Sequence, residues 1–199
     1  DCAMKRFLLF SALLLTACHA SRPHFTVGVS QCSDDAWRQK MNNEMQTEAL
    51  LYDNLELEIR SAGGDSERQI ADIRHFIEQG VDLLIVAPNE AIPVTPVVEE
   101  AYARGIPVIV VDRKILSDHY TAYIGADNYR IGKIIGEYVA SQLGGRGEVI
   151  ELTGLSGSTP AIDRHQGFVN ALKNHPGIRV LCSEDAHWLR SDAEVRADS

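Results

Sequence analysis

Short apolar runs alternate with segments of helical periodicity along the chain from Phe25 onward. The apolar runs are rich in β-branched residues, which favour strands that are covered on both faces. We expect strands at Phe25–Ser30, Leu55–Ala62, Val81–Pro88, Pro107–Val111, Thr121–Asp127, Glu148–Thr153 and Arg179–Ser183. The helical periodicity predicts helices at Asp35–Tyr52, Asp65–Gly80, Ala91–Arg104, Asn128–Leu143 and Thr159–Asn174, and a further one from about Ser191.

This order of elements predicts the fold class. Strands and helices that alternate at this spacing form right-handed βαβ units, which build a parallel sheet with helices on both faces. The pattern restarts after Asp127, so we expect two α/β lobes with Rossmann-like parallel sheets. The first lobe would span residues 25–126, and residues 127–199 would form only part of the second lobe, which is truncated.

Polar residues collect where the expected strands end. Asp112 and Arg113 directly follow one buried strand, and Trp37 and Trp188 each follow a strand end in a different lobe. Ligands of parallel α/β sheets bind beyond the carboxyl ends of the strands, so these residues predict a shared cleft. The alternatives are a surface ion pair between Asp112 and Arg113, and core packing for the two indole rings.

Composition and charge limit the possible partners. The chain has 199 residues with a net charge of −9 and a pI near 5.2, which argues against a broad basic surface for nucleic acid. Cys32 and Cys182 stand too far apart in the sequence to suggest metal ligands or a disulfide framework, and we expect buried or half-buried thiols.

The N-terminus resembles an export signal. A basic start at Lys5-Arg6 precedes the apolar run Phe7–Ala17, so residues 1–24 are interpreted as a signal peptide and the protein as periplasmic. The sequence "LTAC" resembles a bacterial lipobox, which would make Cys18 a lipidated membrane anchor. The alternative is simple cleavage near Ala20 without a lipid.

No motif favours catalysis. The sequence lacks G-x-G-x-x-G after its first strand, and it lacks G-x-S-x-G, H-E-x-x-H and C-x-x-C. The Gly-rich "GLSGST" at Gly154–Thr159 lacks the lysine of a phosphate-binding loop. The neighbouring Asp34 and Asp35 could act as an acid–base pair, but a helix cap is the commoner role. We therefore expect a protein that is not an enzyme and needs no metal and no cofactor.

Three motifs carry a family resemblance. "VDR" at Val111–Arg113, "GADN" at Gly125–Asn128 and "AIDRHQGF" at Ala161–Phe168 resemble the type 1 periplasmic binding proteins, in their ribose-binding branch. The resemblance covers Phe25 to about Arg190 and implies that a monosaccharide, whether a pentose, a hexose or a ketose, binds between the two lobes.

The resemblance also assigns roles to individual residues. It implies that Asp112 and Arg113 bind sugar hydroxyls from the first lobe and that Arg164 does so from the second. Trp37 and Trp188 would pack against the two faces of the sugar. Asp34 stands near the position of a family asparagine; Ala36 replaces a second aromatic residue, and Asn128 looks structural.

Three longer stretches resemble one branch of the family more closely. Ser30–Met45, Leu51–Ala62 and Tyr123–Gly145 resemble the periplasmic sensor domains of hybrid two-component regulators, whose partner is a histidine kinase module beyond a membrane helix. The rivals are the receptor of an ABC sugar importer, whose partner is a permease, and the effector half of a LacI-like repressor. An export signal stands where such a repressor would carry its DNA-binding helices.

Overall fold

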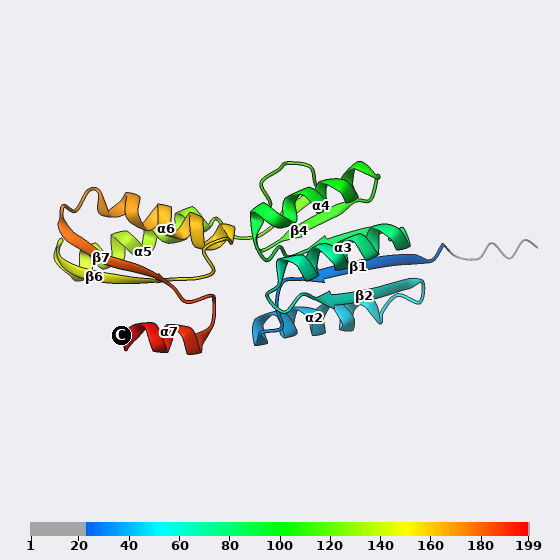
Figure 1. Cartoon of the computed structure of the whole chain (residues 1–199), viewed down its shortest axis with the longest axis horizontal. Helices are drawn as coiled ribbons and strands as arrows, with labels where there is room; N and C mark the ends of the chain where they lie inside the picture. The colour runs from blue at the N-terminus through cyan, green and yellow to red at the C-terminus, as the bar shows by residue number, and fades with distance from the viewer. Residues whose placement is uncertain (1–22, 199) are drawn as a thin grey trace, which may run out of the picture.

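The computed structural model describes residues 23–198 and divides them into two lobes (Figure 1). The expected lipidation site Cys18 and nearly all of the expected signal peptide lie outside the described residues. The two-lobed α/β architecture with parallel sheets, predicted from the sequence, is confirmed. The chain crosses from the first lobe to the second between residues 124 and 128, after the last strand of the first sheet.

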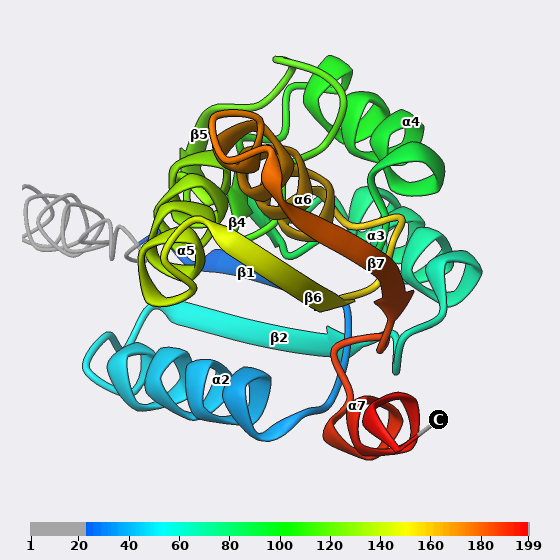
Figure 2. The ribbon, with the colours of Figure 1, turned by 90° about the vertical axis from the view of Figure 1, so that its left-hand side faces the viewer.

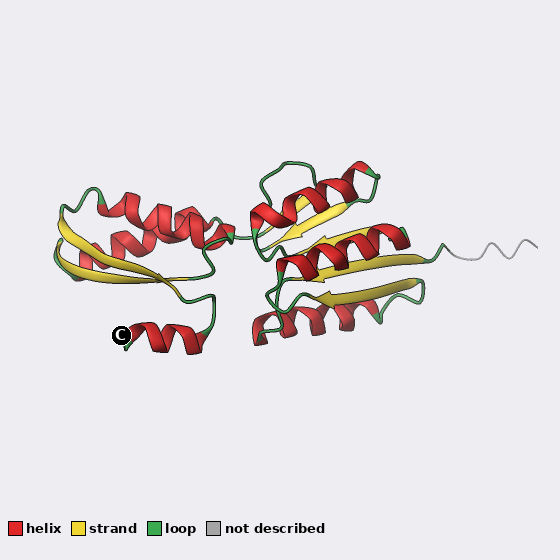
Figure 3. Cartoon of the chain, in the orientation of Figure 1, coloured by secondary structure: helices red, strands yellow, loops and turns green. Residues whose placement is uncertain are grey.

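Lobe one is a five-stranded parallel sheet with helices on both faces (Figures 2 and 3). The strand order is β2-β1-β3-β4-β5. The strands are β1 (Phe25–Gln31), β2 (Leu55–Ser61), β3 (Leu83–Val86), β4 (Val108–Val111) and β5 (Ala122–Ile124). The helices are α2 (Ala36–Ala49) on one face and α3 (Ser66–Gln79) and α4 (Ala91–Ala103) on the other.

The core of lobe one lies between the sheet and the pair α3 and α4. Ile73 and Phe76 of α3 pack there with buried valines of β3, α4 and β4. The ring of Phe76 occupies space that a side chain at Gly28 of β1 would fill, since a Cβ there would lie 2.7 Å from the ring. Asp65, at the start of the expected helix, caps α3 by accepting bonds from two backbone N–H groups, and Gly80 ends the helix in a left-handed conformation.

Helix α2 is shorter than the sequence predicts. It ends at Ala49, and Leu51 and Tyr52 make tighter bonds to carbonyls three residues back. This turn leads directly into β2. The apolar residues that extended the expected helix to Tyr52 therefore belong to a surface turn.

Lobe two contains a two-stranded parallel sheet of β6 (Arg146–Thr153) and β7 (Gly177–Asp185). Helices α5 (Asn128–Gln142) and α6 (Thr159–Leu172) pack together on it, and α7 (Arg190–Ala197) lies apart from this pair (Figure 1). Two glycines let α5 approach α6 closely. A Cβ at Gly132 would lie 1.9 Å from the Arg164 carbonyl oxygen, and one at Gly136 would lie 2.7 Å from Ala171.

The first prediction concerns this helix contact. We expect Gly132→Ala to destabilise the protein by about 1–3 kcal/mol, because the added methyl group must push the α6 backbone away. Urea unfolding followed by circular dichroism measures the change. Lys133→Ala, at the neighbouring exposed position, is the control and should stay within about 0.5 kcal/mol of the parent. Equal midpoints for Gly132→Ala and the parent would contradict the close packing.

The second prediction concerns the N-cap of α2. Burial of Asp35 opposes its ionisation, but bonds from the Ser33 hydroxyl and the Arg38 and Trp37 backbone outweigh it and leave its pKa lowered. A lowered folded-state pKa means that ionised Asp35 stabilises the fold above the unfolded pKa near 4, and that this stability is lost as the pH falls through the folded pKa.

We therefore expect Asp35→Ala to lose about 1 kcal/mol at pH 7 and progressively less below about pH 4. Asp35→Asn, which keeps an acceptor at the cap, should lose less at pH 7. Unfolding midpoints at pH 7 and pH 3 measure both variants. The same deficit for Asp35→Ala at both pH values would show that the cap does not depend on the charge.

Candidate functional site

A cavity of about 320 Å³ lies between the lobes, beyond the carboxyl ends of the lobe-one strands. It is lined by Asp35, Trp37, Arg38, Asp112, Arg113, Pro160, Arg164 and Trp188. Five of the six site residues expected from the sequence are among them. The sixth, Asp34, lines an adjoining cavity of about 420 Å³ that shares Asp35, Arg113 and Trp188 with the first.

Asp112 is held in an unusual conformation at the end of β4. Its φ is +61°, a left-handed value that is costly for a residue other than glycine and occurs at functional sites. Its backbone N–H donates to the Ile124 carbonyl at 2.8 Å, and its carbonyl accepts from the Tyr123 hydroxyl at 2.9 Å. These bonds to β5 fix the carboxylate at the mouth of the sheet.

The partner of Asp112 is Arg38, a residue that sequence reasoning missed. The Arg38 Nη2 donates to the Asp112 Oδ2 at 2.5 Å, whereas the Arg113 Nε stands 4.0 Å from the same oxygen. Arg38 is therefore the closer partner of Asp112, and the contact with Arg113 is a long ion pair to a buried guanidinium rather than the surface pair considered above. Arg38 is only 2% exposed, and among the described residues its Nη1 has no hydrogen-bond partner. A buried N–H group costs free energy unless an acceptor forms a hydrogen bond with it.

A helix start explains how Arg38 reaches the site. Asp35 caps α2 by accepting from the backbone N–H groups of Trp37 and Arg38, which places both side chains in the first turn. The guanidinium carbon of Arg38 lies 4.8 Å from the centre of the Trp37 ring. An arginine on a polar helix is normally solvated, so nothing in the sequence singled out Arg38.

Arg113 points into the protein rather than into solvent. It is buried, and its Nη1 donates to the Asn89 carbonyl at 2.8 Å. Burial lowers the pKa of the Arg113 guanidinium, partly offset by the Cys32 thiol and the Asp112 carboxylate. Asn89 is itself buried, and its backbone N–H donates to the Gln69 side chain at 2.7 Å. The site side of lobe one thus rests on a connected polar network.

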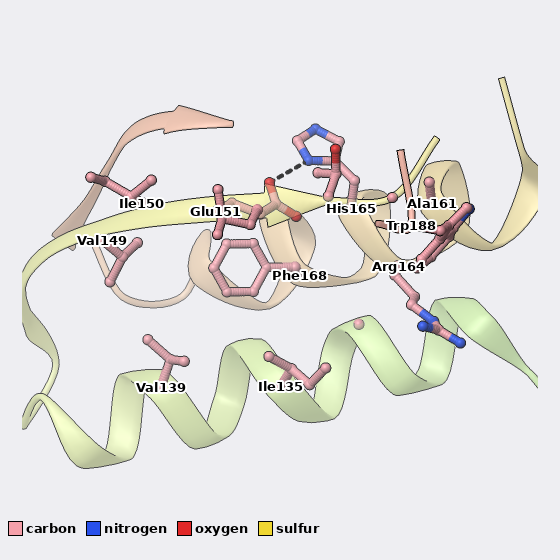
Figure 4. Close-up of a pocket in the computed structure, with 14 residues that line it drawn as sticks. Ile135, Val139, Val149, Ile150, Glu151, Ala161, Arg164, His165, Phe168 and Trp188 are labelled. Carbon is pink, nitrogen blue, oxygen red and sulfur yellow. Dashed lines mark hydrogen bonds and ion pairs between the residues drawn. The ribbon is translucent and has the colours of Figure 1, made fainter. Parts of the chain in front are cut away.

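Lobe two supplies Arg164 and Trp188 (Figure 4). The Arg164 Nε donates to the Asn128 Oδ1 at 2.9 Å, which orients the guanidinium from the first residue of α5. This contact gives Asn128 the structural role expected from the sequence. The guanidinium carbons of Arg113 and Arg164 lie 5.9 Å and 5.5 Å from the Trp188 ring centre, so two cations from different lobes meet one indole.

The Trp188 ring is held from several sides. Its backbone φ of +65° is left-handed, and its Nε1 donates to the Ser158 hydroxyl at 3.1 Å. A Cβ at Gly154 would lie 2.0 Å from the ring, so only glycine leaves room for the indole here. Trp188 is therefore fixed at the opening between the lobes rather than interred in a core. Trp37 is 60% exposed and also faces the cleft, which excludes core packing for it.

Backbone contacts hold the lobes together beside the cavity. The Ala91 N–H donates to the Gly157 carbonyl at 3.0 Å, and the Lys114 N–H donates to the Thr159 hydroxyl at 2.7 Å. A Cβ at Gly157 would lie 2.2 Å from a Glu90 carboxylate oxygen. The Gly-rich Gly154–Thr159 turn thus contacts lobe one.

A separate groove of about 390 Å³ runs along β6 and shares Arg164 and Trp188 with the cleft (Figure 4). Its walls are mainly the apolar side chains of Ile135, Val139, Val149, Ile150 and Phe168. Its polar members Glu151 and His165 are already paired at 2.7 Å. A polyhydroxylated ligand would find few free partners there, whereas the interlobe cavity offers two carboxylates, three guanidinium groups and two indoles.

Three further features of residues 23–198 concern metals, thiols and membrane spans. That part of the chain contains no cluster of three or more His, Cys, Asp or Glu side chains with metal-binding geometry. Cys32 is buried and Cys182 is half-buried, and both are free thiols, as expected. None of its helices is both long and apolar enough to cross a membrane.

Comparisons with known proteins identify the family of the chain. A family model described as "Periplasmic binding protein domain" matches residues 26–199. The galactofuranose-binding protein of Escherichia coli is 36% identical over 98% of this chain and 63% of its own length. The fructose-binding periplasmic domain of a hybrid two-component system is 59% identical, with a TM-score of 0.84 over 88% of this chain and 58% of that one.

A third relative is the binding protein of an arabinose ABC transporter from Shewanella, solved with α- and β-L-arabinofuranose. It is 32% identical, with a TM-score of 0.77 over 87% of this chain and 60% of that one. The chain therefore spans about three fifths of the length of these relatives, whose names describe binding proteins and a sensor domain rather than enzymes. The family match over nearly all the described residues identifies the chain as a member of the periplasmic binding protein family.

Proposed function

We propose that this chain binds a monosaccharide in the cleft between its lobes, in the periplasm, and that the sugar binds as a furanose. The observation that carries the proposal is the convergence of Asp112 and Arg38 from lobe one with Arg164 and Trp188 from lobe two on one cavity. Such a set suits a sugar because hydroxyl groups both donate and accept, while the C–H faces of the ring pack on indoles.

The choice of a furanose rests on the relatives. Two of the three relatives described above are named for or solved with furanoses, and the most similar in sequence is named for fructose, a ketose that can adopt a furanose ring. A cavity of about 320 Å³ lies at the small end of the range for ligand sites, which favours a single sugar unit. We therefore propose fructose as the first ligand to test.

The proposed role is that of a sensor input domain in a membrane-bound hybrid two-component regulator. The identity of 59% to such a domain, against 32% to the arabinose transport protein, supports this role over that of an ABC import receptor. In either role a sugar that contacts both lobes would stabilise the closed arrangement, and the kinase module or the permease would respond to that closure. Membrane attachment through Cys18 or a downstream helix belongs to this proposal.

The proposed ligand class is tested with locked ring forms. We expect methyl β-galactofuranoside to bind at least tenfold more tightly than methyl β-galactopyranoside, and fructose to bind more tightly than ribose. Isothermal calorimetry on the full chain measures these affinities. Equal or reversed affinities for the two galactosides would reject the furanose, and heat that continues at a constant rate after mixing would indicate turnover.

Asp112 and Arg164 are the residues to substitute first. We expect Asp112→Asn and Arg164→Ala each to weaken sugar binding about 30-fold or more, because each loses a charged hydrogen-bond partner worth about 2 kcal/mol or more. Arg179→Ala, which removes an exposed guanidinium from β7 in the same lobe as Arg164, is the matched control. Unchanged affinity in either site variant would remove that residue from the site.

Substitutions of Arg38 test a cleft residue that the structure identifies and the sequence did not. We expect Arg38→Met to lower both sugar affinity and stability, because Asp112 loses the partner that fixes it. Arg38→Lys keeps the charge without the planar fork and should recover stability better than affinity. Calorimetry and urea unfolding of both variants separate the two effects. A variant Arg38→Met with full affinity would restrict Arg38 to a structural role.

A further inference from the structure

Four apolar side chains are exposed together at the end of lobe one that is farthest from lobe two. Leu50, Leu51 and Tyr52 form the turn between α2 and β2 and are 84%, 72% and 52% exposed, and Phe25 at the start of β1 is 44% exposed. Figure 1 shows this turn beside the start of β1, at the opposite end of the strands from the cleft. We call these four residues the apolar tip. Three consecutive exposed apolar residues are unusual on a protein surface.

The small sheet of lobe two also exposes apolar residues, but its position does not account for the exposure of the apolar tip. Exposed apolar residues such as Ile150, Leu152 and Leu181 belong to the strands of the two-stranded sheet, where further strands or helices could cover them. The apolar tip instead belongs to the five-stranded sheet of lobe one, at the amino ends of its strands. Within residues 23–198, no other element covers the apolar tip.

The chain enters the fold at this same place. The Asn54 side chain donates to the Pro23 carbonyl at 2.8 Å, and the Phe25 N–H donates to the Asn54 carbonyl at 2.8 Å. The apolar run Phe7–Ala17 and the candidate lipidation site Cys18 precede Pro23 in the sequence. Five residue steps separate Cys18 from Pro23, so they can span at most about 18 Å. A membrane anchor in this stretch would hold the apolar tip close to the bilayer.

The charged residues around the apolar tip indicate which lipid headgroups it can contact. Glu48, Asp53 and Glu56 surround it in the sequence, and no Lys or Arg stands between Lys40 and Arg60. An acidic rim of this kind is repelled by anionic lipids. The Tyr52 ring is exposed and its hydroxyl donates to Glu48 at 3.3 Å, an arrangement of apolar ring and polar tip that suits the headgroup region of a bilayer.

We propose that the apolar tip inserts into the interfacial region of a bilayer with zwitterionic headgroups, to which the N-terminal segment anchors the chain. The inference rests on the membrane attachment proposed above. A weak apolar contact is sufficient here, because the anchor makes the second contact intramolecular. The insertion fixes the orientation of lobe one: the amino ends of its strands face the lipid, and the sugar cleft at the carboxyl ends faces away.

Depth-dependent fluorescence quenching tests this orientation. The full chain is reconstituted into phosphatidylcholine vesicles with or without brominated acyl chains, carrying either Leu51→Trp or Tyr138→Trp. Tyr138, on α5 in lobe two, is 63% exposed and is the matched control. Trp37 and Trp188 contribute equally to both variants. We expect bromine to quench the added emission of Leu51→Trp at least twofold and to leave that of Tyr138→Trp unchanged.

Each other outcome has a defined meaning. Quenching of Leu51→Trp should weaken when brominated phosphatidylglycerol replaces a third of the lipid; an increase would overturn the choice of zwitterionic headgroups. Equal quenching of the two variants, no quenching, or failure of the chain to float with the vesicles would overturn the proposal. So would Leu51→Trp emission that depends on protein concentration without lipid, which would indicate a second copy. Sugar affinity measured on the same samples reports on the cleft independently.

Discussion

The candidate site depends on one constraint, which is that parallel strands end at the same edge of a sheet. Loops from β1, β3 and β4 must therefore meet in one place, and the crossing after β5 carries lobe two over that edge. The contacts of Ala91 with Gly157 and of Lys114 with Thr159 then hold the second lobe against the first. No single loop builds the site, so a ligand that touches all of it must touch both lobes.

Hydrogen bonds within the protein fix the positions of the charged groups in the cleft before a ligand binds. Asp112 is fixed by Arg38 and by β5, Arg113 by Asn89, and Arg164 by Asn128. Because these bonds already restrict the charged side chains, ligand binding costs little conformational entropy. A preorganised site of this kind can reach useful affinity with a small contact area. Each of the three guanidinium groups already has one partner within the protein, and the Nη1 of Arg38 is left to donate. A neutral molecule rich in hydroxyl groups therefore matches the cleft better than a strongly charged one.

The sequence predicts the fold well because its signals are local. Buried β-branched runs, the Asp65 cap and the Gly80 terminator act within a few residues, and the structure contains each of them. It predicts Asp112, Arg113 and Trp188 as cleft residues because they stand just beyond the ends of strands. It could not predict Arg38, whose importance comes from a partner 74 positions away, or the end of α2 at Ala49, where apolar periodicity continues into a turn.

Hydrogen–deuterium exchange of the full chain with and without fructose tests the central claim most directly, because it reports on both lobes at once. The account predicts that the sugar slows exchange together in three separate segments: residues 33–38 in the first turn of α2, residues 112–114 after β4, and residues 186–189 after β7. Protection confined to one lobe, or protection along the β6 groove without change at residues 112–114, would contradict an interlobe sugar site.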